Sequence, residues 1–269
     1  MAAVLLFSCC TRAAVEDNFA TATLSVGLDR TKADESASSV NVLYAVIYHE
    51  DGTEYQRLTL SGTEGIFDPF DVPVVRGETY QVALWAQNNQ SGLFTVPEGD
   101  VRQVTATYGN VSVNNAVDAA FTYHGTFTLK EDMALSLVLK RAVSLVQVLS
   151  LSDPDLGQIP SGDLLVDVSF EGGVAATFDA LTGTAGPFDG QVDFAPGSCS
   201  GDWVSGTGVD GGPVSLYEVA YVYVLPTGEN ASRIGARVQT TGGTLVGEFE
   251  ATDVPLKANY RTALKGDLF

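Results

Sequence analysis

Hydrophobic and polar residues alternate along much of the chain from residue 19 onward. Residues 41–48 and 217–225 carry this pattern most strongly, with many β-branched and aromatic side chains. A period of two predicts β-strands, because successive side chains of a strand point to opposite faces of a sheet. The same pattern predicts further strands at residues 19–28, 55–60, 78–86, 101–108, 164–170, 174–178, 233–240, 244–250 and 257–265.

Turns that contain glycine separate several of these segments. Asp51-Gly52 lies between residues 41–48 and 55–60, and it predicts a tight hairpin because both central turn residues need a positive φ. The glycines at residues 171–173 predict a second such return, into the strand at 174–178.

Residues 134–151 fit two periods. Leu135, Val138, Leu139, Ala142, Val146 and Leu149 form a helical stripe, whereas Leu135, Leu137, Leu139, Val143 and Leu145 fit alternation. The β-branched residues of the segment favour strands, since they pack well on a pleated surface. Lys140-Arg141 then predicts a bend or bulge between two strands.

One short motif occurs twice. Residues 67–73 and 249–255 both read Phe-x-x-x-Asp-Val-Pro. A chain of 269 residues is long enough for about two domains. The echo and the strand series together predict an all-β protein of two tandem β-sandwich domains, over residues 19–133 and 134–269.

Residues 1–18 have the pattern of a targeting signal followed by a short tether. Leu6-Phe7-Ser8-Cys9 ends an apolar run with a small residue and a cysteine, as in a bacterial lipoprotein signal, which makes Cys9 the expected acylated residue and Cys10 the alternative. No basic residue precedes this short run, so we interpret it as a signal remnant whose true start lies upstream; the other interpretation is a frayed apolar end with two idle cysteines. The sequence contains no run of about 18 apolar residues, so no transmembrane helix is predicted.

Charge narrows the classes of partner. The chain has 33 acidic and 14 basic residues, a net charge of −19. Such an excess disfavours nucleic acid, whose phosphates require Lys and Arg, and it disfavours anionic lipid surfaces for the same reason. We therefore expect contact with a lipid bilayer only through an acyl anchor.

Residues suited to catalysis or metal binding are scarce. His49 and His124 lie far apart, outside any metal-ligand spacing, and no Ser-His-Asp set can be assembled. Acidic loop residues could cage Ca²⁺, but they lack the dense spacing of a calcium loop, so solvated acidic loops are the preferred interpretation; these residues are Asp153, Asp155, Asp189, Asp193, Asp202 and Asp210. We expect no enzyme activity, cofactor or metal.

The two tryptophans differ in context. Trp85 lies within an alternating strand and is expected in the core. Trp203 lies in the Gly- and Ser-rich stretch 197–212, where it is a candidate ligand contact or a cap over a sandwich edge. Cys199, in the same stretch, is expected to be a free thiol.

Several segments, taken in order, carry a family resemblance. They are residues 76–87, with Gly77-x-Thr79-Tyr80 and Leu84-Trp85-Ala86, and residues 101–108, 118–121, 137–143, 177–183 and 253–262. Together they resemble fimbrillin-like surface lipoproteins of Bacteroidota. The resemblance implies two transthyretin-like, Greek-key β-sandwiches. It also implies a fimbrial (pilus) subunit or anchor with a structural or adhesive role at the outer membrane and cell surface, whose partners are other fimbrial or surface proteins.

The resemblance also implies a processing step. In members that polymerise, a protease cuts after an arginine beyond the first strand, and a neighbour's C-terminal strand fills the groove. Arg30 is the matching residue here, and residues 19–28 would be the removable strand. Only residues 266–269 follow the last predicted strand, so we expect either a truncated C-terminus or, preferably, an anchor that accepts strands without donating one. The alternative function is a surface lipoprotein that binds a glycan or peptide.

Overall fold

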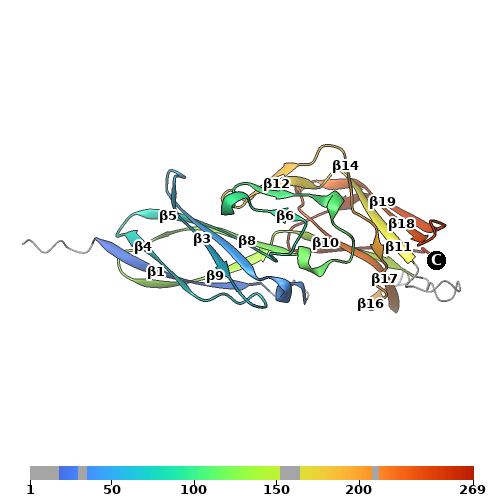
Figure 1. Ribbon diagram of the computed structural model, residues 1–269, viewed down its shortest axis with the longest axis horizontal. Helices are drawn as coiled ribbons and strands as arrows, with labels where there is room; N and C mark the ends of the chain where they lie inside the picture. Colours follow the sequence, from blue (N-terminus) through green and yellow to red (C-terminus); the bar gives the residue numbers. More distant parts are fainter. Residues whose placement is uncertain (1–17, 30–34, 152–163, 208–211) are drawn as a thin grey trace, which may run out of the picture.

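The structure is a computed structural model that describes residues 18–29, 35–151, 164–207 and 212–269. Its regular elements are strands and four short 3₁₀ helices, so the described chain is all-β, as predicted. Figure 1 shows an elongated molecule with two lobes of strands along its long axis. Within the described ranges, no helix has the length and apolar character to cross a membrane.

The first lobe is a β-sandwich of two layers that meet at one corner. One layer has the order β3-β2-β5-β8 and the other β9-β1-β4, and the corner is the short pairing of Phe121 with Arg141 and Thr122 with Lys140. The strands are β1 (Phe19–Leu28), β2 (Val42–His49), β3 (Glu54–Ser61), β4 (Phe70–Val75), β5 (Thr79–Gln87), β8 (Ala120–Thr128) and β9 (Met133–Arg141).

The second lobe also stacks two sheets. One has the order β14-β11-β18-β19, with β15 also paired to β11, and the other has the order β16-β17-β10-β20. The strands are β10 (Ser144–Ser150), β11 (Leu164–Glu171), β14 (Gln191–Asp193), β15 (Gly197–Ser198), β16 (Trp203–Thr207), β17 (Pro213–Val224), β18 (Asn230–Thr240), β19 (Leu245–Pro255) and β20 (Arg261–Gly266).

A third, smaller sheet joins the two halves of the sequence. Its order is β13-β12-β7-β6, and Phe178 of β12 pairs with Val104 of β7. The crossover from β5 to β8 contributes β6 (Phe94–Thr95) and β7 (Val104–Ala106), and the second half contributes β12 (Ala175–Asp179) and β13 (Thr184–Pro187). β6 and β12 lie together in the middle of the molecule (Figure 1). The boundary between residues 133 and 134 stays a prediction, and this sheet spans it.

Three of the four 3₁₀ helices lie in the same crossover. They are η2 (Pro97–Gly99), η3 (Tyr108–Asn110) and η4 (Ala116–Asp118), whereas η1 (Glu35–Ser39) precedes β2. The predicted strand over residues 101–108 is therefore only partly correct. It narrows to β7, because Tyr108 turns into η3 and its hydroxyl donates to the carbonyl of Ala175 at 2.8 Å.

The sheet formed by β2 and β5 is buried on both faces. Ile47 pairs with Val82 and Val46 pairs with Ala83, so the side chains of Tyr80 and Tyr48 lie on opposite faces of the sheet. On one face the hydroxyl of Tyr80 accepts a hydrogen bond from Val75 N of β4 at 3.2 Å. That contact places this face against the β9-β1-β4 layer, in the core of the sandwich.

The other face of the same sheet packs on the crossover and on the second half of the chain. The ring of Trp85, fully buried as predicted, lies 5.5 Å from those of Phe94 and Phe178. Its indole N–H donates to Gln87 Oε1 at 2.7 Å, which satisfies the one polar atom of the ring. An aromatic contact between β5 and β12 thus supports the pairing of β7 with β12.

β1 matches its predicted bounds and is an inner strand of its layer. It pairs in parallel with β9 on one side and antiparallel with β4 on the other. Ala20, Ala22 and Leu24 point into the core and are buried. Residues 134–151 form the two strands β9 and β10, as the β-branched residues predicted. The break lies at residues 142–143 and not at the predicted Lys140-Arg141, which are the last two residues of β9.

Two turn predictions need correction. At Asp51-Gly52 only Gly52 has a positive φ, of 83°, and the register shifts between Ile47 and Tyr48, so a bulged turn replaces the two-residue type. The chain does not return after residues 171–173 either. β12 leaves β11 and pairs with β7 and β13, because Phe178 is buried against Trp85 instead.

The repeated Phe-x-x-x-Asp-Val-Pro motif does not mark equivalent positions. In the first copy Val72 of β4 pairs with Ala22 of β1. In the second copy Val254 of β19 pairs with Ala231 of β18, its hairpin neighbour. Both valines are buried and both strands are sheet edges, but their partners differ, so the echo does not identify corresponding strands of the two sandwiches.

Candidate functional site

A pocket of about 630 Å³ lies where the two halves of the sequence meet. It is formed by the corner of β8 and β9, the turn between β12 and β13, the turn after β17 and the loop before β20. Its volume lies within the roughly 300–1,000 Å³ of small-ligand sites, and its exposed wall is mostly apolar, which is typical of such sites.

Basic side chains gather at this pocket. Lys140, Arg141 and Lys257 line it, with His124 beside them, and no Asp or Glu is among its described lining residues. This composition is unusual for a chain with a net charge of −19. Neither lysine forms an ion pair within the described ranges. The described lining of the pocket is therefore basic, although the protein as a whole is acidic.

Arg141 is the buried member of the basic group. It ends β9, is 1% exposed, and pairs across the corner with Phe121. Its Nη2 donates to the carbonyl of Tyr260 at 3.0 Å, which ties the corner of the first lobe to the loop before β20. A buried guanidinium needs such partners, because an unpaired charge in the interior is very unfavourable. Arg141 thus positions the pocket walls as well as contributing charge.

The rest of the wall combines apolar and hydrogen-bonding groups. Phe178, Pro226 and Leu256 are the larger apolar members, and Thr122, Thr184, Thr227 and Asn259 bring hydroxyl and amide groups. Asn259 has a φ of 62°, and its backbone N–H donates to the carbonyl of Val143 at 3.1 Å. Its buried Oδ1 accepts no hydrogen bond from any described residue.

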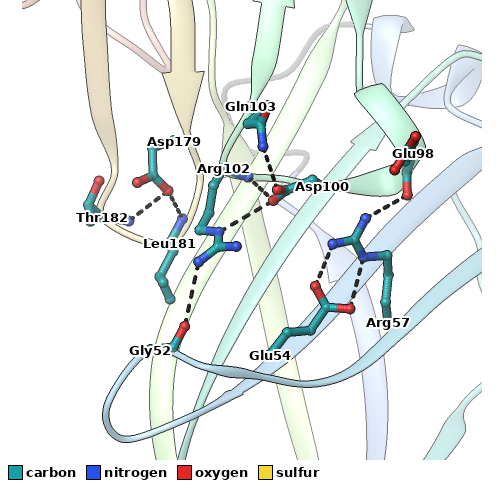
Figure 2. Close-up of polar contacts among 10 residues, drawn as sticks. All are labelled: Gly52, Glu54, Arg57, Glu98, Asp100, Arg102, Gln103, Asp179, Leu181 and Thr182. Atoms are coloured by element: carbon teal, nitrogen blue, oxygen red, sulfur yellow. Dashed lines mark hydrogen bonds and ion pairs between the residues drawn. The ribbon is translucent and has the colours of Figure 1, made fainter.

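The turn between β12 and β13 forms one wall and depends on Gly183. This residue has a φ of 69°, and a Cβ there would lie 3.0 Å from His124 Cε1. Asp179 holds the turn by accepting from Leu181 N at 2.8 Å and Thr182 N at 3.4 Å (Figure 2). A glycine therefore lets the turn approach β8 closely.

A second polar cluster, also drawn in Figure 2, holds the crossover on β2 and β3. Arg57 forms an ion pair with Glu54 and donates to the carbonyl of Glu98 at 2.7 Å. The Arg102 guanidinium lies 4.9 Å from the ring centroid of Tyr48, and Arg102 N donates to Asp100 at 3.0 Å.

The carboxylate of Asp100 is the centre of this cluster. Burial raises its pKa, but hydrogen bonds from Arg102 N and Gln103 outweigh burial, so the pKa of Asp100 falls below its ordinary value. Because these charges are already paired with protein groups, we interpret the cluster as a structural clamp.

Trp203 is not among the residues that line the pocket between the two halves of the sequence, which we call the junction pocket. Trp203 begins β16, an edge strand and not a loop, and its side chain is 54% exposed. The Trp203 ring packs edge-to-face on the ring of Tyr217, with the two ring centroids 5.5 Å apart. This contact agrees only in part with the expected cap over a sandwich edge. The ligand-contact role of Trp203 stays a prediction.

Of the other predicted residues, Cys9, Cys10 and Arg30 lie outside the described residues. Cys199 forms no disulfide within the described ranges, and burial raises its pKa to about 11, so its thiol stays protonated at neutral pH. Where the structure describes the chain, no group of three or more His, Cys, Asp or Glu side chains could hold a metal ion.

Sequence reasoning missed Glu218 of β17, which is buried although it is an acid. It accepts hydrogen bonds from Gln147 Nε2 and from Ser200 Oγ, the latter at 3.0 Å. Burial, together with nearby Asp202, raises the pKa of Glu218 despite these bonds. The only signal in the sequence is an acid within an otherwise apolar strand.

The sequence belongs to a family of unknown function, DUF6562, whose model matches residues 12–269. No curated protein sequence matches the chain.

Solved structures share the fold at low identity. A candidate cell adhesion protein from Bacteroides uniformis has a TM-score of 0.55 and 13% identity, covering 93% of this chain and 95% of its own. A candidate adhesin from Bacteroides ovatus has a TM-score of 0.52 and 9% identity, covering 92% and 87%. A candidate polysaccharide-binding protein from Bacteroides thetaiotaomicron has a TM-score of 0.51 and 10% identity, covering 86% and 80%. At these identities the comparison concerns the fold alone.

Proposed function

We propose that this protein is a cell-surface adhesion protein of the fimbrial type, held at the outer membrane by an acyl chain on Cys9. The fold it shares with candidate adhesion proteins supports this proposal, as does the lipoprotein-like Leu6-Phe7-Ser8-Cys9. Its partners would be other fimbrial or surface proteins. The role is structural or adhesive and involves no catalysis.

The position of β1 is the observation that carries the proposal. Residues 22–28 pair with β9 and residues 19–24 pair with β4, so removal of β1 would leave two strand edges facing each other. Such edges bind an added strand through backbone hydrogen bonds. Val72, Val74, Leu137 and Leu139 are buried on the flanking strands and would form the apolar floor of the groove. A strand with small side chains would fit this floor as Ala20 and Ala22 do.

The last described strand and the residues after it belong to the second sandwich. β20 pairs with β10, Leu268 is 2% exposed, and Leu268 N donates to Ser150 Oγ at 3.2 Å. These residues are therefore used within their own sandwich. In the proposed function the protein is an anchor that accepts a strand from the next subunit.

The test is strand exchange after cleavage. The protein is treated with an Arg-specific protease, cleavage after Arg30 is verified by N-terminal sequencing, and a fluorescent peptide of residues 19–28 is added. We expect the peptide to enter the cleaved protein, whereas an Arg30→Lys variant excludes it. A peptide with Leu24→Asp is the matched control, because Leu24 is buried. Failure of exchange after complete cleavage contradicts strand acceptance, and long homopolymers without any partner contradict the anchor role.

Attachment is tested separately. Cys9→Ala, expressed from an upstream start with a complete signal, should move the protein from the membrane fraction to the supernatant. Retention of labelled palmitate by this variant would mean that Cys9 is the wrong residue, and Cys10→Ala is then the decisive comparison.

A second candidate function is capture of a ligand at the surface, and the junction pocket favours it. A concave apolar wall with a few convergent polar groups is the usual form of a small-ligand site. An adhesion protein can carry such a site without any change to its strand exchange, so the two functions are compatible.

A further inference from the structure

We infer that the junction pocket binds an acidic saccharide, with the carboxylate of a uronic or sialic acid residue held by the exposed Lys140 and Lys257 beside the buried guanidinium of Arg141. The inference deepens the second candidate function, ligand capture, and is independent of strand exchange.

Charge gives the first step. Three basic side chains converge on one pocket that has no acidic lining residue, while acids outnumber bases 33 to 14 in the chain as a whole. The two lysines are exposed and form no ion pair among described residues, so their charges are available to a ligand. The complementary ligand carries negative charge.

The walls give the second step. Phe178, Pro226 and Leu256 offer an apolar surface, which an inorganic anion such as phosphate cannot use. A pyranose ring has an apolar C–H face that packs on such a wall while its substituents stay polar. With about 630 Å³, the pocket has room for more than a single small anion.

Hydrogen-bonding groups give the third step. Three threonine hydroxyls and the amide of Asn259 line the pocket, and each hydroxyl can both donate and accept. Asn259 Oδ1 is a buried acceptor without a donor among described residues. The ring hydroxyls of a sugar are complementary to threonine hydroxyls and an amide, so a polyhydroxylated ligand suits this part of the wall.

The elements that form the pocket disfavour an extended peptide. One common way for a peptide to bind a β-protein is to add a strand to a free edge. This pocket is formed mostly by turns and strand ends, at residues 183–185, 226–228 and 256–259, which offer no long ladder of backbone groups. Charge, wall and hydroxyl groups therefore agree on an acidic sugar.

Binding of matched saccharides is the main test. Purified full-length protein is titrated with trigalacturonate, N-acetylneuraminic acid and neutral galactotriose by isothermal calorimetry, at low and at high salt. We expect at least one acidic probe to bind roughly 10-fold or more tightly than galactotriose, and we expect added salt to weaken that binding because it screens the exposed lysines.

Variants locate the site. Lys257→Gln and Lys140→Gln should each weaken acidic binding roughly 2- to 5-fold, as for exposed charge pairs. Lys130→Gln, an exposed lysine that does not line the pocket, removes the same charge and should change nothing. Asn259→Gly suits the positive φ and removes the amide, so it should weaken binding as well.

The outcomes separate the two ideas. Equal binding of acidic and neutral trisaccharides would overturn the inference and leave ligand capture in place. Binding of neither acidic nor neutral probes would overturn both. Acidic binding that all three pocket variants retain would place the site elsewhere and also overturn the inference. The lysine variants keep the test decisive if Asn259→Gly does not fold, since both lysines are exposed.

Discussion

Leu84→Ala tests the packing of the first lobe. Leu84 is fully buried on β5, pairs with Ala45 of β2 and Tyr123 of β8, and shares the core-facing side of the sheet with Tyr80. The substitution removes about three methylene equivalents, or roughly 2.4 kcal/mol of transfer free energy. The substitution also leaves a cavity, because a strand held on both sides cannot collapse, and the cavity costs further free energy. We therefore expect the free energy of unfolding to fall by about 3–4 kcal/mol, within the usual 2–5 kcal/mol.

The assay uses the chain's two tryptophans. A Trp203→Phe background leaves Trp85, which is buried in the first lobe, as the single fluorescent reporter of urea unfolding. This choice matters because a molecule with two lobes need not unfold in one step. Val138→Ala is the control, in the same lobe as the reporter. Val138 is 54% exposed on β9, so its truncation should change the free energy of unfolding by less than about 0.5 kcal/mol. A change that small for Leu84→Ala would refute its place in the core.

Two further predictions concern the junction and a buried acid. Gly183→Ala should destabilise the fold by about 1–3 kcal/mol in thermal or urea unfolding, because this glycine combines a positive φ with a close approach to His124. Gly242→Ala is the control, since a Cβ at that position would make ordinary contacts. Equal effects of the two substitutions would contradict the reasoning. Glu218→Gln should stabilise the protein near pH 7. The pKa of Glu218 is raised in the folded state, so its stabilising contribution is present at low pH and is lost as the pH rises through that pKa. The difference between variant and parent in urea midpoint should shrink near pH 4, and a difference that is constant with pH would assign the effect to packing.

The sequence by itself determined the strands. Alternation is a local property of the chain, so the bounds of β1, the two strands in residues 134–151 and the burial of Trp85 could all be predicted from it. The series of strands and the family resemblance both indicated the sandwich architecture. Neither alternation nor resemblance could say what covers Trp85, because the residues that do so, Phe94 and Phe178, belong to a crossover and to the other half of the chain.

Only the tertiary structure decided strand pairing and the site. Residues 171–173 look like a hairpin turn, yet β12 leaves β11 because burying Phe178 on Trp85 outweighs a local return. The basic pocket was invisible for a related reason. Net charge sums over the whole chain and carries no positions, whereas the pocket depends on Lys140 and Lys257, more than 100 residues apart, meeting at one corner. Long-range contacts bring them together, and no local pattern in the sequence encodes those contacts.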